Sequence, residues 1–180
     1  MNGLTILEEN DLKGVTSIPC NTVLKTSSQV TEAKRHLKAL DLFPHHDTIK
    51  SWDTSKMIDI IIKADRQSFI LDIGCNDSPI LPMLKRLGFM NLFGCDLVLQ
   101  PRYKRNFMNT IYSAYKRGYK PVVDMYNDKH LKLSIQSLEE TNYQSNTFDF
   151  VTSLSVIEHG VDIHKYFMVI ILVFFDWQSS

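Results

Sequence analysis

The order of hydrophobic and polar positions predicts short helices and strands along most of the chain. From Ser28 to Asp41 the apolar residues recur at intervals of three and four, which predicts an amphipathic helix, and Pro44 follows its end. A second helix is predicted where Asp53 or Thr54 caps a run of methionine and isoleucine residues. Residues 1–27 show no sustained period, so no element is predicted there.

The stretch from Phe69 to Pro79 has the pattern of a strand, a tight turn and a helix. A short apolar run ends in Asp72, Gly74 opens a polar loop, and Ser78 with Pro79 has the residue types that begin a helix. In a parallel sheet such a turn lies at the carboxyl end of its strand, where the helix N-terminus exposes unpaired amides. We therefore expect a ligand at this loop first.

Further strands are predicted downstream. The second runs from Asn91 to Asp96, and the third is either Pro121 to Met125 or Leu131 to Ile135. The fourth begins near Phe148. The apolar run from Phe167 to Phe175 is too short for a membrane-spanning helix, which needs about 20 residues. The remaining interpretations are a buried fifth strand and the tail of a truncated product.

Composition narrows the classes of partner. The 180 residues are 44% hydrophobic, which is enough for the core of one compact fold. Equal numbers of basic and acidic side chains give a net charge of zero, so no global charge favours nucleic acid or an anionic membrane. Three widely spaced cysteines form neither a disulfide framework nor a zinc knuckle, and the N-terminus lacks the pattern of a secretory signal. These features predict a cytoplasmic protein.

Residues 101–120 interleave basic and aromatic side chains. In helical register the rings share one face and the charges lie elsewhere, which favours an ordinary amphipathic helix over an RNA-binding or anion-binding patch. The chain between the second and third strands is longer than one crossover helix requires. This insert is a candidate lid or substrate-recognition element.

The loop after the first strand resembles the first motif of the class I S-adenosylmethionine-dependent methyltransferases, in particular their type 11-like domain. That motif commonly reads Leu-Asp-Ile-Gly-Cys-Gly, and Leu71 to Cys75 match it. Asn76 replaces the second glycine, and asparagine tolerates the left-handed backbone region better than most residues. The segment from Phe148 to His159 resembles the family's fourth strand and the residues after it.

The resemblance implies a fold and a division of the chain. The expected fold is a Rossmann-like, doubly wound α/β fold, with a mostly parallel sheet that has helices on both faces and lacks the terminal strands. Residues 65–180 would form this S-adenosylmethionine-binding domain, and residues 1–64 a helical lead that caps the cofactor or substrate. In that lead, Trp52 and the two histidines His45 and His46 are candidates for the cap, and a loop anchored by the tryptophan is the alternative.

The resemblance also implies where the cofactor is held. Asp96 lies roughly 20 residues after the glycine turn, so its carboxylate would end the adjacent strand and accept hydrogen bonds from both ribose hydroxyls. The turn of Gly74, Cys75 and Asn76 would hold the methionine part through its amides. Asp72 would position the loop or the cofactor amine.

The remaining site residues follow from the third and fourth strands. If Leu131 to Ile135 is the third strand, Ser137 and Leu138 would lie against the adenine, and Leu97 and Ser153 would complete the cofactor contacts. His159 is the candidate general base, because an imidazole titrates near neutral pH. A metal site at His45, His46 and Asp47, or at His159 and His164, is the less favoured reading, because no further ligands stand at a recognisable spacing.

The favoured function is an S-adenosylmethionine-dependent methyltransferase that acts on a small molecule such as a metabolite or a sugar. One alternative is a non-catalytic or truncated nucleoside-binding module, since no glycine-rich turn follows Gly160. The other is an NAD-dependent oxidoreductase, which the lone Gly74 supports poorly because a dinucleotide loop needs Gly-x-Gly-x-x-Gly. The apolar segment after Tyr166 is a candidate surface for self-association.

Overall fold

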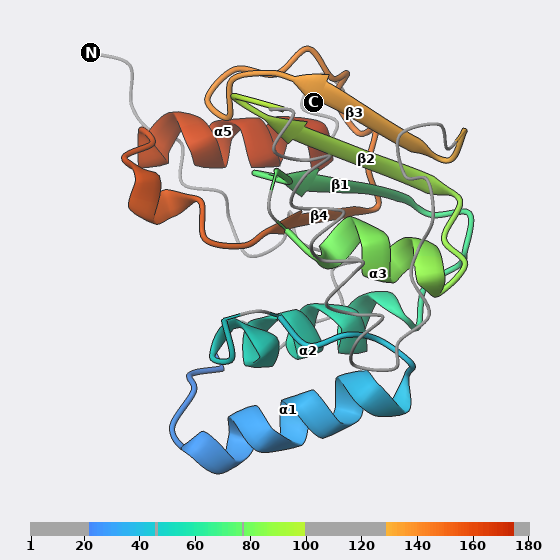
Figure 1. Ribbon diagram of the computed structural model, residues 1–180. Coiled ribbons are helices and arrows are strands. Elements are labelled where there is room, and N and C mark those ends of the chain that lie inside the picture. Colours follow the sequence, from blue (N-terminus) through green and yellow to red (C-terminus); the bar gives the residue numbers. More distant parts are fainter. Residues whose placement is uncertain (1–21, 46, 77, 100–128, 175–180) are drawn as a thin grey trace, which may run out of the picture.

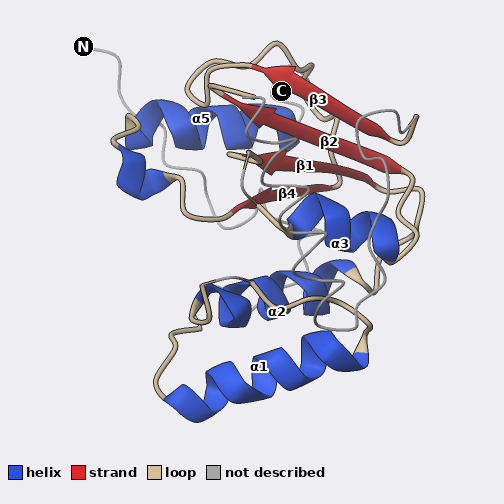
Figure 2. Cartoon of the chain, viewed as in Figure 1, coloured by secondary structure: helices blue, strands red, loops and turns tan. Residues whose placement is uncertain are grey.

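The computed structural model describes residues 22–45, 47–76, 78–99 and 129–174 (Figures 1 and 2). In chain order these residues form α1 (Ser27–Ala39), α2 (Lys50–Ile61), β1 (Phe69–Ile73), α3 (Ile80–Arg86), β2 (Asn91–Asp96), β3 (Leu131–Ile135), β4 (Phe150–Ser153), the 3-10 helix η2 (Ile157–His159) and α5 (Ile163–Phe174).

The four strands form one sheet in the order β3-β2-β1-β4, and every neighbouring pair is parallel. The chain therefore extends the sheet on one side of β1 with β2 and β3, and then returns to the other side of β1 with β4. The carboxyl ends of β1, β2 and β4 meet at this reversal, which is where ligands bind in doubly wound sheets. The prediction of a third strand at Leu131 to Ile135 is confirmed. The other candidate segment, 121–125, and the predicted helix at 101–120 lie outside the described residues.

Helices cover both faces of the sheet. Successive residues of a strand point to opposite faces, so Ile70 and Leu71 of β1 belong to different hydrophobic clusters. The cluster around Ile70 includes Leu37 of α1, Ile58 of α2 and several residues of α3. The cluster around Leu71 includes two residues of α5, Tyr166 and Val173. In Figure 1, α1 and α2 lie side by side, and α3 lies between them and the sheet. The predicted Rossmann-like architecture is confirmed.

The second helix begins earlier than its sequence predicts. Asp53 and Thr54 were expected to precede it, but α2 starts at Lys50 and both residues lie inside the helix. The hydroxyl of Thr54 donates to the carbonyl oxygen of Lys50 at 2.8 Å, so it bonds back into the helix instead of capping its start. Asp47 forms the turn before the helix, where its Oδ1 accepts the Ile49 N–H at 3.0 Å.

The apolar run after Tyr166 belongs to the helix α5, and its prediction as a buried fifth strand is wrong. Asp162 starts α5, where its Oδ1 accepts the N–H groups of His164 and Lys165. The buried side chains of the helix, Tyr166, Val169 and Val173, are spaced by three and four residues, which is the period of a helix packed on the sheet.

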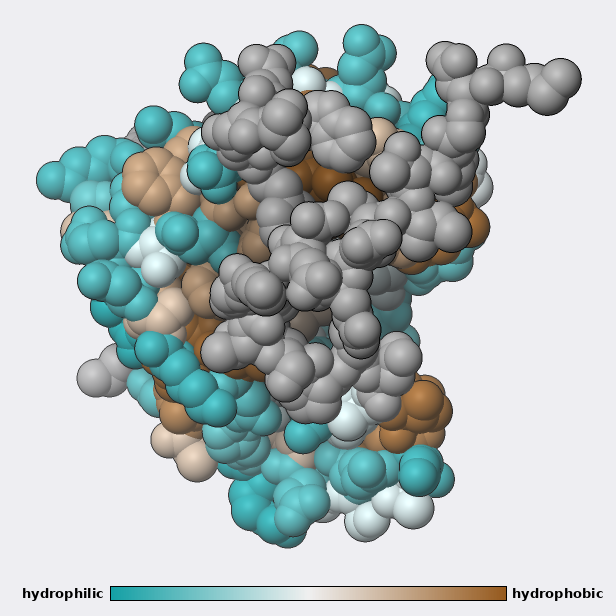
Figure 3. Space-filling model, turned by 180° about the vertical axis from the view of Figure 1, so that it is seen from behind, coloured by the Kyte–Doolittle hydropathy of each residue, from teal (hydrophilic) through white to brown (hydrophobic). Residues whose placement is uncertain are grey.

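The positions between those buried residues are also apolar, and they hide the helical period in the sequence. Phe167, Met168 and Leu172 of α5 are exposed large hydrophobic side chains. The space-filling view from behind shows brown areas separated by teal ones among the coloured residues (Figure 3). Within the described ranges, no helix has the length and apolar character needed to cross a bilayer.

Candidate functional site

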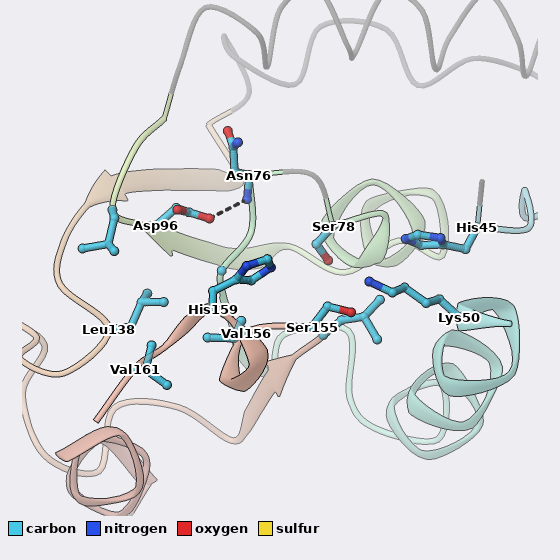
Figure 4. Close-up of a pocket in the computed structure, with 13 residues that line it drawn as sticks. His45, Lys50, Asn76, Ser78, Asp96, Leu138, Ser155, Val156, His159 and Val161 are labelled. Carbon is cyan, nitrogen blue, oxygen red and sulfur yellow. Dashed lines mark hydrogen bonds between the residues drawn. The ribbon is translucent and has the colours of Figure 1, made fainter. Parts of the chain in front are cut away.

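A cavity of about 400 Å³ lies at the carboxyl ends of β1, β2 and β4 (Figure 4). Cavities of this size are typical of small-molecule sites. Its lining comes from the turn after β1 (Gly74, Asn76, Ser78), the end of β2 (Asp96, Leu97), the connection between β3 and β4 (Leu138), the segment after β4 (Leu154, Ser155, Val156, His159, Val161) and the start of α2 with the segment before it (His45, Lys50).

The turn after β1 requires glycine at position 74 for two reasons. Gly74 has a φ of 74°, in the left-handed region that side chains disfavour. A Cβ at this position would lie 2.3 Å from Cγ2 of Val156, which is far inside van der Waals contact. Gly74 therefore lets the segment after β4 close directly over the β1 turn.

The three amides of this turn already have acceptors within the protein. The N–H groups of Gly74 and Cys75 both donate to the carbonyl oxygen of Cys95, at 2.8 and 3.2 Å. The N–H of Asn76 donates to Oδ2 of Asp96 at 3.0 Å. These bonds fix the β1 turn to the end of β2. The turn therefore offers a ligand no row of free amides, although Gly74 and Asn76 line the cavity.

Asn76 does not need the left-handed tolerance that its place in the motif predicted. The non-glycine residues with positive φ in the described part of the chain are Asp41, Asn146 and Ser155. Asn76 therefore adopts an ordinary backbone conformation, so a second glycine is not required at this position.

Asp96 ends β2 and lines the cavity. Besides the Asn76 N–H on Oδ2, its Oδ1 accepts the N–H of Val98 at 3.4 Å. A carboxylate has about four acceptor positions, so Asp96 retains capacity for hydroxyl donors in the cavity. Leu97, the next residue, adds an exposed apolar side chain to the same lining.

Asp72 lies beneath the turn and is fully buried. Its Oδ1 accepts a hydrogen bond from the Thr152 hydroxyl at 2.7 Å, while Oδ2 has no well-formed hydrogen bond to the described residues. Burial raises the pKa of Asp72 to about 6, although the hydroxyls of Thr152 and Ser78 oppose the shift. Asp72 thus supports the turn from below and does not line the cavity.

The segment after β4 forms the wall opposite Asp96. Ser155 has a φ of 60°, an uncommon conformation for a residue with a side chain and one that often marks functional sites. His159 lies on η2, where its N–H donates to the Val156 carbonyl at 3.0 Å. In Figure 4 its imidazole projects into the cavity between Asp96 and Ser155.

The structure brings six of the ten predicted site residues to one cavity: Gly74, Asn76, Asp96, Leu97, Leu138 and His159. The other four, Asp72, Cys75, Ser137 and Ser153, are not part of its lining.

The surroundings of the remaining predicted residues explain their positions. Cys75 is buried against Gly94. A Cβ added to Gly94 would lie 2.7 Å from Sγ of Cys75. Burial raises the pKa of the Cys75 thiol, which therefore stays protonated. The Ser137 hydroxyl accepts the N–H of Glu139 at 3.2 Å. Ser153 is the last residue of β4 and pairs with Ile73 of β1.

Two residues of the expected cap, His45 and Trp52, lie in different places. His45 lines the cavity, as its place before β1 suggested, whereas Trp52 lines a separate hollow between α1 and α2. His46 lies outside the described residues. Within the described ranges, no three His, Cys, Asp or Glu side chains are grouped so that they could hold a metal ion.

Lys50, Val156 and Val161 line the cavity without having been singled out in the sequence. Val156 lies within the matched segment from Phe148 to His159, but its contact with Gly74 is a feature that the resemblance does not give. Lys50 belongs to no motif at all. A correct prediction of the start of α2 would have placed it at the amino end of a helix that leads into β1.

No family model and no curated protein matches this chain. Among solved structures, a Methanococcus maripaludis protein assigned as an S-adenosyl-L-methionine-dependent methyltransferase is similar, with a TM-score of 0.50 and 14% identity over 87% of this chain and 64% of its own. An Aquifex aeolicus SAM-dependent methyltransferase has a TM-score of 0.44 and 15% identity, over 83% and 68%. The [4+2]-cyclase SpnF has a TM-score of 0.47 and 17% identity, over 86% and 58%.

These comparisons concern the fold. The chain has the fold of the class I S-adenosylmethionine-dependent methyltransferases, and it spans less than two thirds of the length of the Methanococcus protein. Because one fold supports different reactions, the activity has to be argued from the site.

Proposed function

We propose that this chain binds S-adenosylmethionine in the cavity at the carboxyl ends of β1, β2 and β4, and that it transfers the methyl group to a small molecule. The observation that carries the proposal is that Asp96 and Gly74 face one cavity, at the strand reversal of a methyltransferase fold. A dinucleotide is the poorer ligand, because the turn has a single glycine for the approach of a pyrophosphate.

The residues of the cavity suit the parts of this cofactor. In the proposal, Asp96 accepts hydrogen bonds from the ribose hydroxyls, and Leu97 and Leu138 pack against the adenine. The methionine part lies along the turn at Gly74, which lines the cavity. Asp72 contributes indirectly, since its hydrogen bond to Thr152 ties β1 to β4 beneath the turn. Cys75, Ser137 and Ser153 act in the same way, as supports behind the lining.

A bound sulfonium supplies an electrophilic methyl group, so the protein has to align an acceptor and remove a proton. Alignment alone can contribute several kcal/mol to catalysis. His159 is the proposed base, because its imidazole projects into the cavity and histidine is a common general base. The acceptor is proposed to be small, such as a metabolite or a sugar, because the cavity volume of about 400 Å³ is typical of small-molecule sites. The residues before β1 are proposed to act as a cap, through His45 and Lys50.

The proposal is tested by calorimetric titration with S-adenosylmethionine, S-adenosylhomocysteine and NAD. We expect the first two to bind and NAD to bind weakly or not at all. Asp96→Ala should lower the affinity for S-adenosylhomocysteine by roughly 30-fold or more, since a charge-assisted hydrogen bond to a buried partner contributes about 2 kcal/mol. Asp59→Ala is the matched control, because Asp59 pairs with His36 on the far side of α2.

Two results would contradict the proposal. Tight binding of NAD alone would indicate an oxidoreductase. Unchanged affinity in Asp96→Ala would refute the ribose assignment. Turnover is then measured as formation of S-adenosylhomocysteine in the presence of a metabolite extract, and binding without any turnover would indicate a non-catalytic module.

A further inference from the structure

The cavity has chemically different ends. In Figure 4, Asp96 and Leu138 lie toward one end, and Lys50 and His45 lie at the other. The β1 turn, Ser78 and Ser155 lie between them. An acidic group and a basic group therefore face the same volume from opposite sides.

Lys50 reaches this volume from a remote part of the chain. It is the first residue of α2, is partly buried, and extends its ammonium toward Ser78 and Ser155 (Figure 4). Among the described residues, no carboxylate lies within salt-bridge distance of its Nζ. An ammonium that is partly removed from water without an ionic partner favours the binding of an anion at that position.

The acidic residues around Lys50 do not neutralise it by contact. On its own segment, Asp53 lies within electrostatic reach, where burial raises the pKa of Asp53 and Lys50 opposes that rise. From η2, Glu158 is also within reach, and its pKa is lowered first by a hydrogen bond from its own backbone and further by Lys50. Glu158 is fully exposed to solvent, so its charge is well screened.

We infer that Lys50 binds the α-carboxylate of the methionine part of S-adenosylmethionine, an inference that rests on the proposed function. With the ribose at Asp96 and the adenine at Leu138, the amino-acid part passes the turn at Gly74 and ends where Lys50 points. The ammonium of Lys50 then faces the carboxylate, and the carboxylate of Asp96 accepts hydrogen bonds from the uncharged ribose hydroxyls. A lysine can fill this role because its ammonium is a compact charge on a flexible stem that can reach a carboxylate.

The test compares two ligands that share the adenosine and the sulfur but differ in the amino-acid part. S-adenosylhomocysteine carries the amino-acid carboxylate, whereas 5′-methylthioadenosine has the same nucleoside and sulfur without it. In calorimetric titration of the full chain, Lys50→Gln should lower the affinity for S-adenosylhomocysteine about 10-fold or more. It should lower the affinity for 5′-methylthioadenosine by less than about 2-fold. Lys50→Arg keeps the positive charge and should retain most of the affinity.

Lys56→Gln is the matched control. Lys56 is an exposed lysine of the same helix, but it lines the hollow between α1 and α2 instead of this cavity. It should leave the affinity for both ligands unchanged. A second readout is ionic strength: added salt should weaken S-adenosylhomocysteine binding more in the wild type than in Lys50→Gln. The thermal midpoint of each variant checks that the fold is retained.

The possible failures are distinguishable. If S-adenosylhomocysteine does not bind the wild type, the proposed function fails and the inference fails with it. If it binds but Lys50→Gln changes the affinity for neither ligand, Lys50 does not bind the carboxylate, and the inference is overturned. If both ligands weaken equally, Lys50 acts on the shape of the cavity, and the inference is again overturned.

Discussion

The contact between Gly74 and Val156 determines how the segment after β4 closes over the β1 turn, and it can be tested by substitution. In Gly74→Ala the new Cβ would stand 2.3 Å from Cγ2 of Val156, whereas carbon atoms in contact lie about 3.5–4.0 Å apart. The backbone φ of 74° adds a second cost, because alanine disfavours the left-handed region.

The expected magnitude follows from these two terms. The left-handed conformation costs roughly 1–2 kcal/mol, and overpacking of a closed contact typically costs 1–3 kcal/mol. Gly74→Ala should therefore lower the free energy of unfolding by about 2–5 kcal/mol. Gly160→Ala is the matched control, since Gly160 has a φ of 81° but nothing lies within 4 Å of its added Cβ. It should show the backbone cost alone, about 1–2 kcal/mol.

A double-mutant cycle isolates the steric term. Val156 is buried, so Val156→Ala alone should cost about 2 kcal/mol, but in the Gly74→Ala background it removes the clashing methyl groups. The coupling free energy between the two substitutions should be about 1–3 kcal/mol, as measured by urea unfolding. The reasoning is refuted if Gly74→Ala costs no more than Gly160→Ala and shows no coupling to Val156→Ala.

Two further predictions concern Asp72 and α5. The fold raises the pKa of Asp72 to about 6, so the protonated carboxyl is favoured in the folded state, and stability is lost as the pH rises from about 4 to about 6. Compared with Asp72→Asn, the wild type should lose up to about 3 kcal/mol of unfolding free energy across that range, and parallel pH profiles would contradict the buried acid. On α5, Val173→Ser should cost about 2–3 kcal/mol because Val173 is fully buried, whereas Phe167→Ser should stay within about 0.5 kcal/mol. If the exposed face of α5 joins two copies of the chain, Phe167→Ser should also lower the dimer fraction in sedimentation, and equal costs for both substitutions would contradict the helical assignment.

The parts of the fold that the sequence predicted are those with short-range signals. The strand and turn from Phe69 to Gly74 are recognisable because an apolar run, an acid and a glycine are adjacent in the chain. Asp96 is recognisable because one strand–helix–strand unit fixes its distance from that glycine. Each of these relations is contained within one βαβ unit, so no knowledge of distant packing is needed.

The helix α5 was missed because its local pattern is ambiguous. A continuous apolar run has neither the two-residue period of a half-buried strand nor a clear helical stripe. Docking on the sheet decides the matter, since it buries Tyr166, Val169 and Val173 and leaves Phe167 and Met168 exposed. The start of α2 was missed for a related reason. Thr54 has the residue type of a cap, but its hydroxyl donates a hydrogen bond to the Lys50 carbonyl within the helix.

The residues of the sequence motif and the residues that face the cavity have different roles at this site. The amides of Gly74, Cys75 and Asn76 all bond to the end of β2, and Gly74 itself is required by Val156, so the motif residues chiefly hold three strand ends together. A sequence can therefore replace the second glycine with Asn76 and keep the cavity, because that position needs no special backbone conformation. Lys50 is in the opposite situation: nothing in the packing of the turn requires it, yet its ammonium points into the cavity. Recognition at this site is thus divided between residues that a local pattern reveals and a side chain that only the docking of α2 against the sheet brings into reach.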